Sequence, residues 1–149
     1  MLFRSGTGGG DANTVLIDAG ALAFSLNANS MILNSGTDRK SAYRTTVKRI
    51  WGQAQVASNK YVTLQWADDT NSPLVTFGTG HFDYNFDREG MSGAIATPVG
   101  ANATGNIIFT STATTGDAWT LFIDLKKNNT DYDAGQTRDP AAFNKAGIP

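Results

Sequence analysis

The stretch Asp117-Ala118-Trp119-Thr120-Leu121-Phe122-Ile123-Asp124-Leu125 carries the longest clean alternation of apolar and other residues in the chain. Successive side chains of a β-strand point to opposite faces, so every second residue shares a face. Burial of a large apolar side chain contributes about 1.5–3 kcal/mol, which makes the apolar face of this stretch a strong driving force for folding. The pattern therefore predicts a central strand of a β core, with Trp119, Leu121, Ile123 and Leu125 facing inward and Thr120, Phe122 and Asp124 on the other face.

Further strand-like runs precede this strand, and turn-forming residues such as Gly, Asn, Asp and Pro separate them. Together they predict about eight to ten short strands, spaced by about 8–12 residues, and no helix of three turns. This organisation is typical of an all-β protein, specifically an antiparallel β-sandwich that is jelly-roll-like. The runs cover residues 14–18, 21–26, 30–33, 39–51, 61–66, 74–77, 81–89 and 106–112.

The two ends of the chain differ in composition from the middle. Residues 1–13 contain Gly6, Gly8, Gly9 and Gly10, whose backbone entropy opposes ordering, so we expect a flexible Gly-rich N-terminal arm. Residues 14–126 form the predicted β-sandwich domain. Residues 127–149 show little periodicity and contain Gly135 and Pro140, which predicts an extended C-terminal arm. If that arm docks on a partner, its anchors are Tyr132, Phe143 and Ile148.

The composition of the chain excludes several classes of function. The chain has no cysteine and a single histidine, His81, which excludes a disulfide framework and every Cys/His zinc pattern. No apolar run reaches the length of about 18–20 residues that a membrane-spanning helix needs, and the first residues lack the apolar core of a signal peptide. We expect a protein that is made in the cytoplasm, has no membrane partner and requires no cofactor.

Charge is distributed unevenly along the chain. Residues 1–60 carry seven Lys/Arg and three Asp, whereas residues 61–149 carry five Lys/Arg and ten Asp/Glu, which gives +4 and −5 for a net charge of −1. A basic half and an acidic half favour contact with a complementary surface, such as another copy of the same protein, over binding to nucleic acid. Folding that interleaves the two halves would reduce this asymmetry.

A basic segment follows the turn at residues 34–38. Four of its cations, Arg39, Lys40, Arg44 and Lys48, form what we call the basic stripe. On a strand, Lys40, Arg44 and Lys48 would share one face. Two interpretations are open: a solvated outer face, or a surface that docks on an acidic partner.

No catalytic group is singled out by the sequence. His81 is the only possible base for a Ser-His-Asp triad, and it lies in an alternating strand pattern without any Gly-x-Ser-x-Gly elbow. No pair of carboxylates stands out as a glycosidase pair. We therefore predict a protein that is not an enzyme.

Metal binding has little support in the residue pattern. Asp83-x-Asn85-x-Asp87 is similar to the start of an EF-hand loop, but Arg88 replaces the required Gly and Ala94 the required Glu. A strand with period-two polarity explains these residues more simply. We predict no metal site, with a weak calcium site at Asp68, Asp69 or Asp83 as the alternative.

Four aromatic residues offer a different kind of surface. Trp51, Trp66, Tyr43 and Tyr61 would suit sugar stacking if they formed a flat platform, as in carbohydrate-binding modules. The favoured interpretation places Trp66 in the core and leaves Trp51 partly buried at a strand end.

The overall style of the chain resembles that of virion structural proteins of tailed bacteriophages, and of capsid decoration (cement) proteins in particular. The features that carry this resemblance are a cysteine-free β domain, the Gly-rich start, and the strand Leu121-Phe122-Ile123-Asp124-Leu125-Lys126-Lys127 that runs into the tail at residues 132–140. The resemblance implies a jelly-roll knob, often trimeric, that sits on the outer capsid surface where major capsid subunits meet. A phage tail or neck component and a carbohydrate-binding β-sandwich module are the alternatives.

This resemblance gives a working hypothesis for the partner surface. The two arms would clasp neighbouring virion subunits, while the basic stripe would face an acidic surface of the major capsid protein. The residues expected to bind partners are Arg39, Lys40, Arg44, Lys48, Tyr132, Arg138, Phe143 and Ile148.

Overall fold

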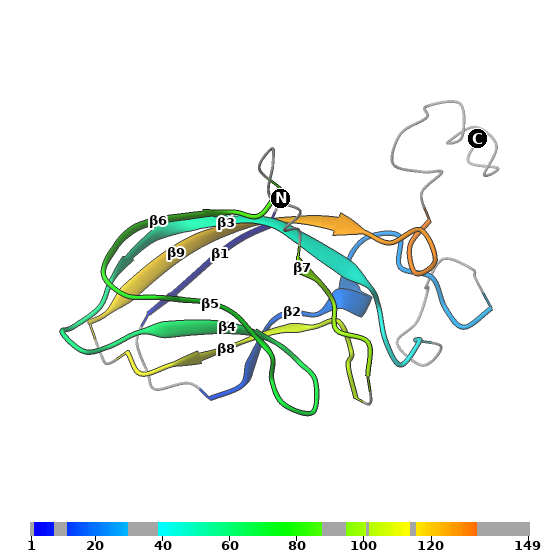
Figure 1. Ribbon diagram of the computed structural model, residues 1–149, viewed down its shortest axis with the longest axis horizontal. Coiled ribbons are helices and arrows are strands. Elements are labelled where there is room, and N and C mark those ends of the chain that lie inside the picture. The colour runs from blue at the N-terminus through cyan, green and yellow to red at the C-terminus, as the bar shows by residue number, and fades with distance from the viewer. Residues whose placement is uncertain are drawn as a thin grey trace.

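The computed structural model describes the backbone of residues 2–7 and all of residues 12–29, 39–87, 95–100, 102–113 and 116–133. In this part of the chain two antiparallel sheets pack face to face (Figure 1). Sheet A contains, in spatial order, β1 (Leu2–Thr7), β9 (Ala118–Lys127), β3 (Thr45–Gln55) and β6 (Gly80–Asn85), with the short β7 (Ile95–Ala96) also paired to β3. Sheet B contains β2 (Thr14–Ile17), β8 (Ile107–Ser111), β4 (Val62–Trp66) and β5 (Pro73–Phe77).

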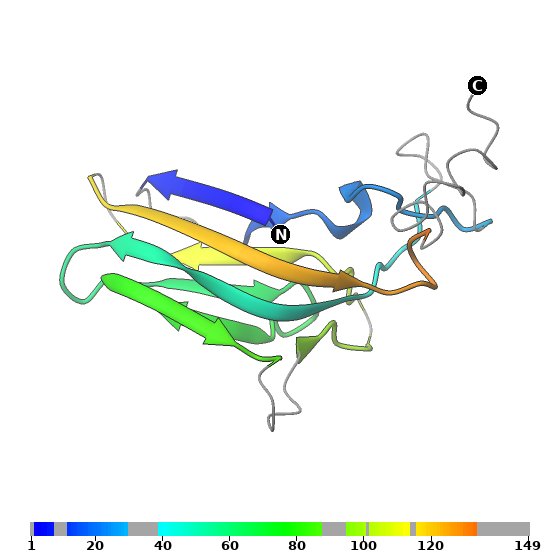
Figure 2. The same cartoon turned by 90° about the horizontal axis from the view of Figure 1, so that it is seen from above.

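The order of these strands is that of a jelly roll. Strands β1, β2, β3 and β4 alternate between the two sheets, β5 stays beside β4, and β6, β8 and β9 alternate again. This crossing pattern interleaves two Greek keys, which is the definition of the jelly-roll sandwich. Figure 2 shows sheet A from outside, with β9 lying between β1 and β3. The prediction of an all-β, jelly-roll-like antiparallel sandwich is confirmed.

The core lies between the two sheets and is built on β9, as its alternation predicts. Trp119, Leu121 and Ile123 are buried, whereas Thr120 and Phe122 alternate with them on the outer side. Sheet B supplies the opposing layer of the core. Its buried core side chains are Leu16 and Ile17 of β2, Val62, Leu64 and Trp66 of β4, Val75 and Phe77 of β5, and Ile107 and Phe109 of β8.

The start of the chain differs from the expected flexible arm. Residues 2–7 form β1, which pairs with β9 in continuous register from Leu2↔Ile123 to Thr7↔Ala118. Main-chain pairing along a central strand compensates for the backbone entropy that glycine loses, because each added residue extends an existing ladder. The sandwich therefore begins well before residue 14.

The basic segment and the run before it also differ from expectation. Strand β3 begins at Thr45 and not at Arg39. Residues 21–26 form no strand, since the 3-10 turn η1 (Ala19–Ala21), capped by the Asp18 side chain, leads into two isolated bridges, Ser25↔Tyr132 and Asn27↔Arg39. The described residues contain no helix that is long and apolar enough to cross a membrane.

The first residues of the predicted C-terminal arm belong to the folded domain. Lys127 still belongs to β9, and residues 128–131 form a turn that returns Tyr132 to the domain. Residues 134–149, which include Arg138, Phe143 and Ile148, lie outside the described residues.

Candidate functional site

The four cations of the basic stripe pair with carboxylates of the same chain. Arg39 pairs with Asp18, Lys48 with Asp87, and both Lys40 and Arg44 with Asp131. Three of these pairs join the basic first half of the sequence to the acidic second half, so folding interleaves the charges. The structure does not bring the stripe together as one uncompensated surface.

Asp131 is the centre of the most buried of these ion pairs. Only 4% of its side chain is exposed, and its carboxylate accepts from the backbone N–H of Arg44 at 2.9 Å. The Lys40 ammonium lies 3.2 Å from Asp131 Oδ1 and also donates to the carbonyl of Thr130 at 2.7 Å. Asp131 therefore ties the turn after β9 to the chain just before β3.

Tyr132 follows directly and is buried against Tyr43, with ring centroids 5.8 Å apart. Its hydroxyl donates to the carbonyl of Ala19 at 2.9 Å, and the Lys127 ammonium lies 5.3 Å from its ring centroid. Burial raises the pKa of the Tyr132 hydroxyl and lowers the pKa of Lys127. In the structure Tyr132 anchors the end of β9 within its own domain.

The outer face of sheet A carries a second group of polar and aromatic side chains, arranged in rows across three strands. Trp51 of β3 lies opposite Phe122 of β9 and Asp83 of β6, which gives an aromatic row. Gln53 lies opposite Thr120 and His81, which gives a polar row. The two rows are about 7 Å apart, because two residues of a strand span that length.

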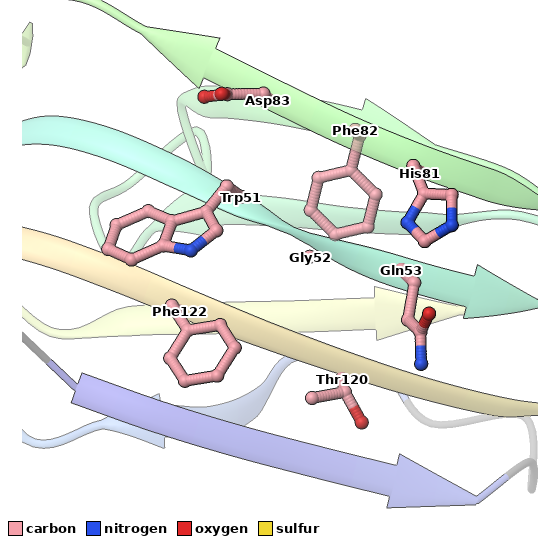
Figure 3. Close-up of a pocket in the computed structure, with 8 residues that line it drawn as sticks. All are labelled: Trp51, Gly52, Gln53, His81, Phe82, Asp83, Thr120 and Phe122. Carbon is pink, nitrogen blue, oxygen red and sulfur yellow. The ribbon is translucent and has the colours of Figure 1, made fainter.

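These two rows enclose a hollow of about 350 Å³, shown in Figure 3. A second hollow of about 450 Å³ adjoins it and shares Gln53, His81 and Thr120. The second hollow continues along the strands to Gly80 and Ala118. The outer face of sheet A thus has one continuous groove, which we call the sheet A groove.

Gly52 shapes the floor of this groove. A Cβ atom at Gly52 would lie 2.1 Å from the backbone oxygen of Thr120, so only glycine allows the close pairing of β3 and β9 at this position. Phe82, the cross-strand neighbour of Gly52, lines the groove and also stacks on Phe77 inside the sandwich, with ring centroids 4.2 Å apart. The groove floor is therefore continuous with the core.

An ion pair fixes one end of the aromatic row. The Arg49 guanidinium binds Asp83 through two hydrogen bonds, of 2.9 and 2.6 Å, and lies 4.8 Å from the centroid of the Trp51 ring. The hydrogen bonds from Arg49 lower the pKa of Asp83, so this carboxylate is ionised at neutral pH. Arg49 and Asp83 thereby restrict the position of the Trp51 indole.

Only part of this site is predictable from the sequence. Trp51 is partly buried, as expected, but it lies within β3 and not at its end. Trp66 is in the core and only 2% exposed, Tyr43 is buried, and Tyr61 is exposed beside β4 of the other sheet, so these four aromatics form no common platform. The partner of Trp51 is Phe122, which the alternation of β9 had placed on the outer face.

The carboxylates considered for calcium are engaged with protein groups. Asp69 accepts from Asn102 at 2.5 Å, and Asp83 is bound by Arg49. Asp68 accepts from Thr70 and Ser72. Among the described residues, no group of three or more His, Cys, Asp or Glu side chains is arranged to hold a metal ion.

Asp68 leads to a prediction about pH. The Ser72 hydroxyl donates to it at 2.6 Å, and this bond, with further bonds from Thr70 and Ser72, lowers the Asp68 pKa below its ordinary value of 3.8. A lowered folded-state pKa stabilises the protein fully above the unfolded pKa, and this stabilisation is lost as pH falls through the folded value. Asp68→Asn should therefore destabilise the protein at pH 6 and destabilise it less at pH 3, as measured by urea unfolding. Equal destabilisation by Asp68→Asn at pH 6 and at pH 3 would contradict a lowered pKa of Asp68 in the folded protein.

Comparison with known proteins returned no match: no family model, no curated protein and no solved structure resembles the chain significantly.

Proposed function

We propose that the chain is a non-enzymatic virion structural protein of the capsid-decoration type, which binds an assembled shell and stabilises it. The jelly-roll strand order supports this proposal, since that architecture recurs in viral capsid domains, although lectin domains and cupins also use it. Because one fold serves many functions, only a particular surface of this molecule can favour one function over another.

The observation that carries the proposal is the open edge of β1. One side of β1 pairs with β9 along its whole length, and no other described strand pairs with its second side. Such an edge presents unpaired N–H and C=O groups to a strand of a neighbouring subunit. Strand addition to β1 would join this domain to the shell or to another copy of itself.

Because the cations of the basic stripe are already paired within the chain, we propose that the interface lies elsewhere on the molecule. A cation that is already paired with a carboxylate of its own chain gains little from a second acidic partner. We therefore assign docking to the β1 edge and to residues 134–149, which follow the anchor at Tyr132 in the sequence and lie outside the described residues. Binding of this kind should change little between low and high ionic strength, whereas docking through the stripe would weaken in high salt.

A binding protein of this type stabilises a shell by mass action. It binds the assembled state and not the dissociated subunits, so its binding free energy opposes disassembly. Self-association in which the β1 edge of one copy pairs with a different sheet edge of the next copy can close a ring. We propose a trimer of this kind, with the major capsid protein as its partner on the outer capsid surface.

Two proline variants test the role of the β1 edge. Ser5→Pro and Gly6→Pro each remove one N–H, and neighbouring residues of a strand direct their N–H groups to opposite sides. One variant should disturb the β9 ladder and lower the Tm, while the other should keep the wild-type Tm and lose binding. Binding is measured by co-sedimentation with shells of the virus that encodes the chain, and self-association by light scattering. Full shell occupancy by the variant with the wild-type Tm would overturn the proposal.

A further inference from the structure

We propose that the sheet A groove binds a neutral saccharide, with Trp51 and Phe122 as the stacking platform and Gln53, His81 and Thr120 as the hydrogen-bonding rim. This inference adds a ligand to the protein and does not depend on the assembly function proposed above. The groove lies on the outer face of the sheet, away from the open edge of β1.

The two rings of the platform lie nearly parallel and offset from each other. Their centroids are 5.4 Å apart and their planes differ by 15°, which is an offset-stacked arrangement. Figure 3 shows Trp51 on β3 and Phe122 on the neighbouring β9, both beside the hollow. Aromatic rings that line a hollow in this way suit the C–H face of a sugar ring.

The polar row beside the platform has hydrogen-bonding capacity left for a ligand. Within the described part of the chain, the side chains of Gln53, His81 and Thr120 make no hydrogen bond to another protein group. Together they offer an amide donor and acceptor, an imidazole and a hydroxyl. Sugar hydroxyls, which both donate and accept, match this mixed row better than a ligand with acceptors alone.

The volume of the groove and the charge of its lining residues limit the class of ligand that it can bind. The two adjoining hollows, of about 350 and 450 Å³, fall in the range of small-molecule sites, about 300–1,000 Å³, and not of protein interfaces. Neither hollow is lined by Lys or Arg, and the one carboxylate in them, Asp83, is bound by Arg49. The described lining of the groove therefore suits a neutral oligosaccharide, because the cation beside it, Arg49, is already bound to Asp83.

Contacts within the protein restrain the side chains and strands that form the groove. Arg49 and Asp83 restrict the Trp51 indole at one end, and Gly52 fixes the close approach of β3 and β9 below it. A site that is ordered in advance loses less conformational entropy on binding.

The protein contains a natural reporter for this site. Of its three tryptophans, Trp66 and Trp119 are 2% and 4% exposed, so Trp51 is the one whose fluorescence an external quencher reaches readily. The test titrates the full chain with cellotetraose, maltotetraose and mannotetraose. At least one of them should bind saturably by calorimetry and protect Trp51 from acrylamide.

Variants then assign the binding to the groove. Trp51→Ala should weaken binding at least tenfold and Gln53→Ala about fivefold, since the first removes the platform and the second one rim contact. The matched control is Tyr61→Ala, which removes an exposed aromatic side chain beside the other sheet and should leave the affinity unchanged. Circular dichroism and Tm verify that each variant is folded, and Gln53→Ala keeps the test informative if Trp51→Ala destabilises the protein.

Two outcomes would overturn the proposal. One is the absence of binding and of quenching protection with all three tetrasaccharides. The other is binding that Trp51→Ala and Gln53→Ala leave unchanged. Shell binding measured on the same variants separates the two functions, because loss of sugar binding should leave co-sedimentation intact.

Discussion

Gly105→Ala is expected to lower the free energy of unfolding by roughly 3–5 kcal/mol, from backbone strain and steric overlap together. Gly105 has a φ of +83°, a conformation that alanine adopts only with strain. In addition, a Cβ atom there would lie 1.7 Å from the backbone oxygen of Tyr43. The chain around Tyr43, whose N–H donates to the carbonyl of Thr104 at 3.0 Å, would have to move away. Because a domain of this kind is stable by only about 5–15 kcal/mol, the variant should be close to unfolding.

Two other glycines separate the causes of this effect. Gly116 also has a positive φ, of +97°, but no atom of the described residues lies within 4 Å of an added Cβ, so Gly116→Ala should cost about 1–2 kcal/mol from strain alone. Gly100 has equally open space, and Gly100→Ala should change stability by less than about 0.5 kcal/mol. Urea unfolding followed by tryptophan fluorescence measures all three. Equal losses for Gly105→Ala and Gly116→Ala would show that the close contact with Tyr43 is unimportant.

Asp131→Ala is expected to cost about 2–3 kcal/mol, at or just below the lower end of the range for breaking a buried ion pair, because both of its cations are partly exposed. The variant leaves the backbone N–H of Arg44 and the ammonium of Lys40 without their carboxylate. It also releases the turn that places Tyr132 against Tyr43. Unfolding in urea at neutral pH gives the loss directly.

Two variants act as controls for Asp131→Ala. Asp131→Asn keeps an oxygen that accepts from the Arg44 N–H, so it should recover part of the loss. Asp87→Ala removes an ion pair with Lys48 in which 52% of the carboxylate side chain is exposed, and it should cost less than about 1 kcal/mol. If Asp131→Ala and Asp87→Ala cost the same, burial of the Asp131 carboxylate does not contribute.

The fold could be predicted from the sequence because its signals are local. The alternation in residues 117–125 separates the inward Leu121 and Ile123 from the outward Thr120 and Phe122 on its own, and the structure agrees. The same argument fails for residues 2–7, because their strand depends on a partner more than a hundred residues away in the sequence. The glycine content of a segment predicts how flexible the isolated segment is. It does not predict whether the segment pairs with a strand elsewhere in the chain.

The candidate site could not be predicted because it depends on register between distant strands. Trp51, Asp83 and Phe122 come from three separate segments, and only the pairing of β3 with β6 and β9 makes them a row. The ion pairs of the basic stripe could not be predicted for the same reason. Its spacing along the chain was visible, but Asp131, which pairs with Lys40, lies 91 positions further on.

The pairing of the first strand with the last has a consequence for biosynthesis. β1 is synthesised more than a hundred residues before its only described partner, β9, which is complete at Lys127. Until then sheet A lacks this central strand, and closing such a long loop is slow compared with local folding. The β1 edge therefore becomes part of a sheet only after Lys127 has been added, so nascent chains that end before β9 cannot present the edge that we propose for docking.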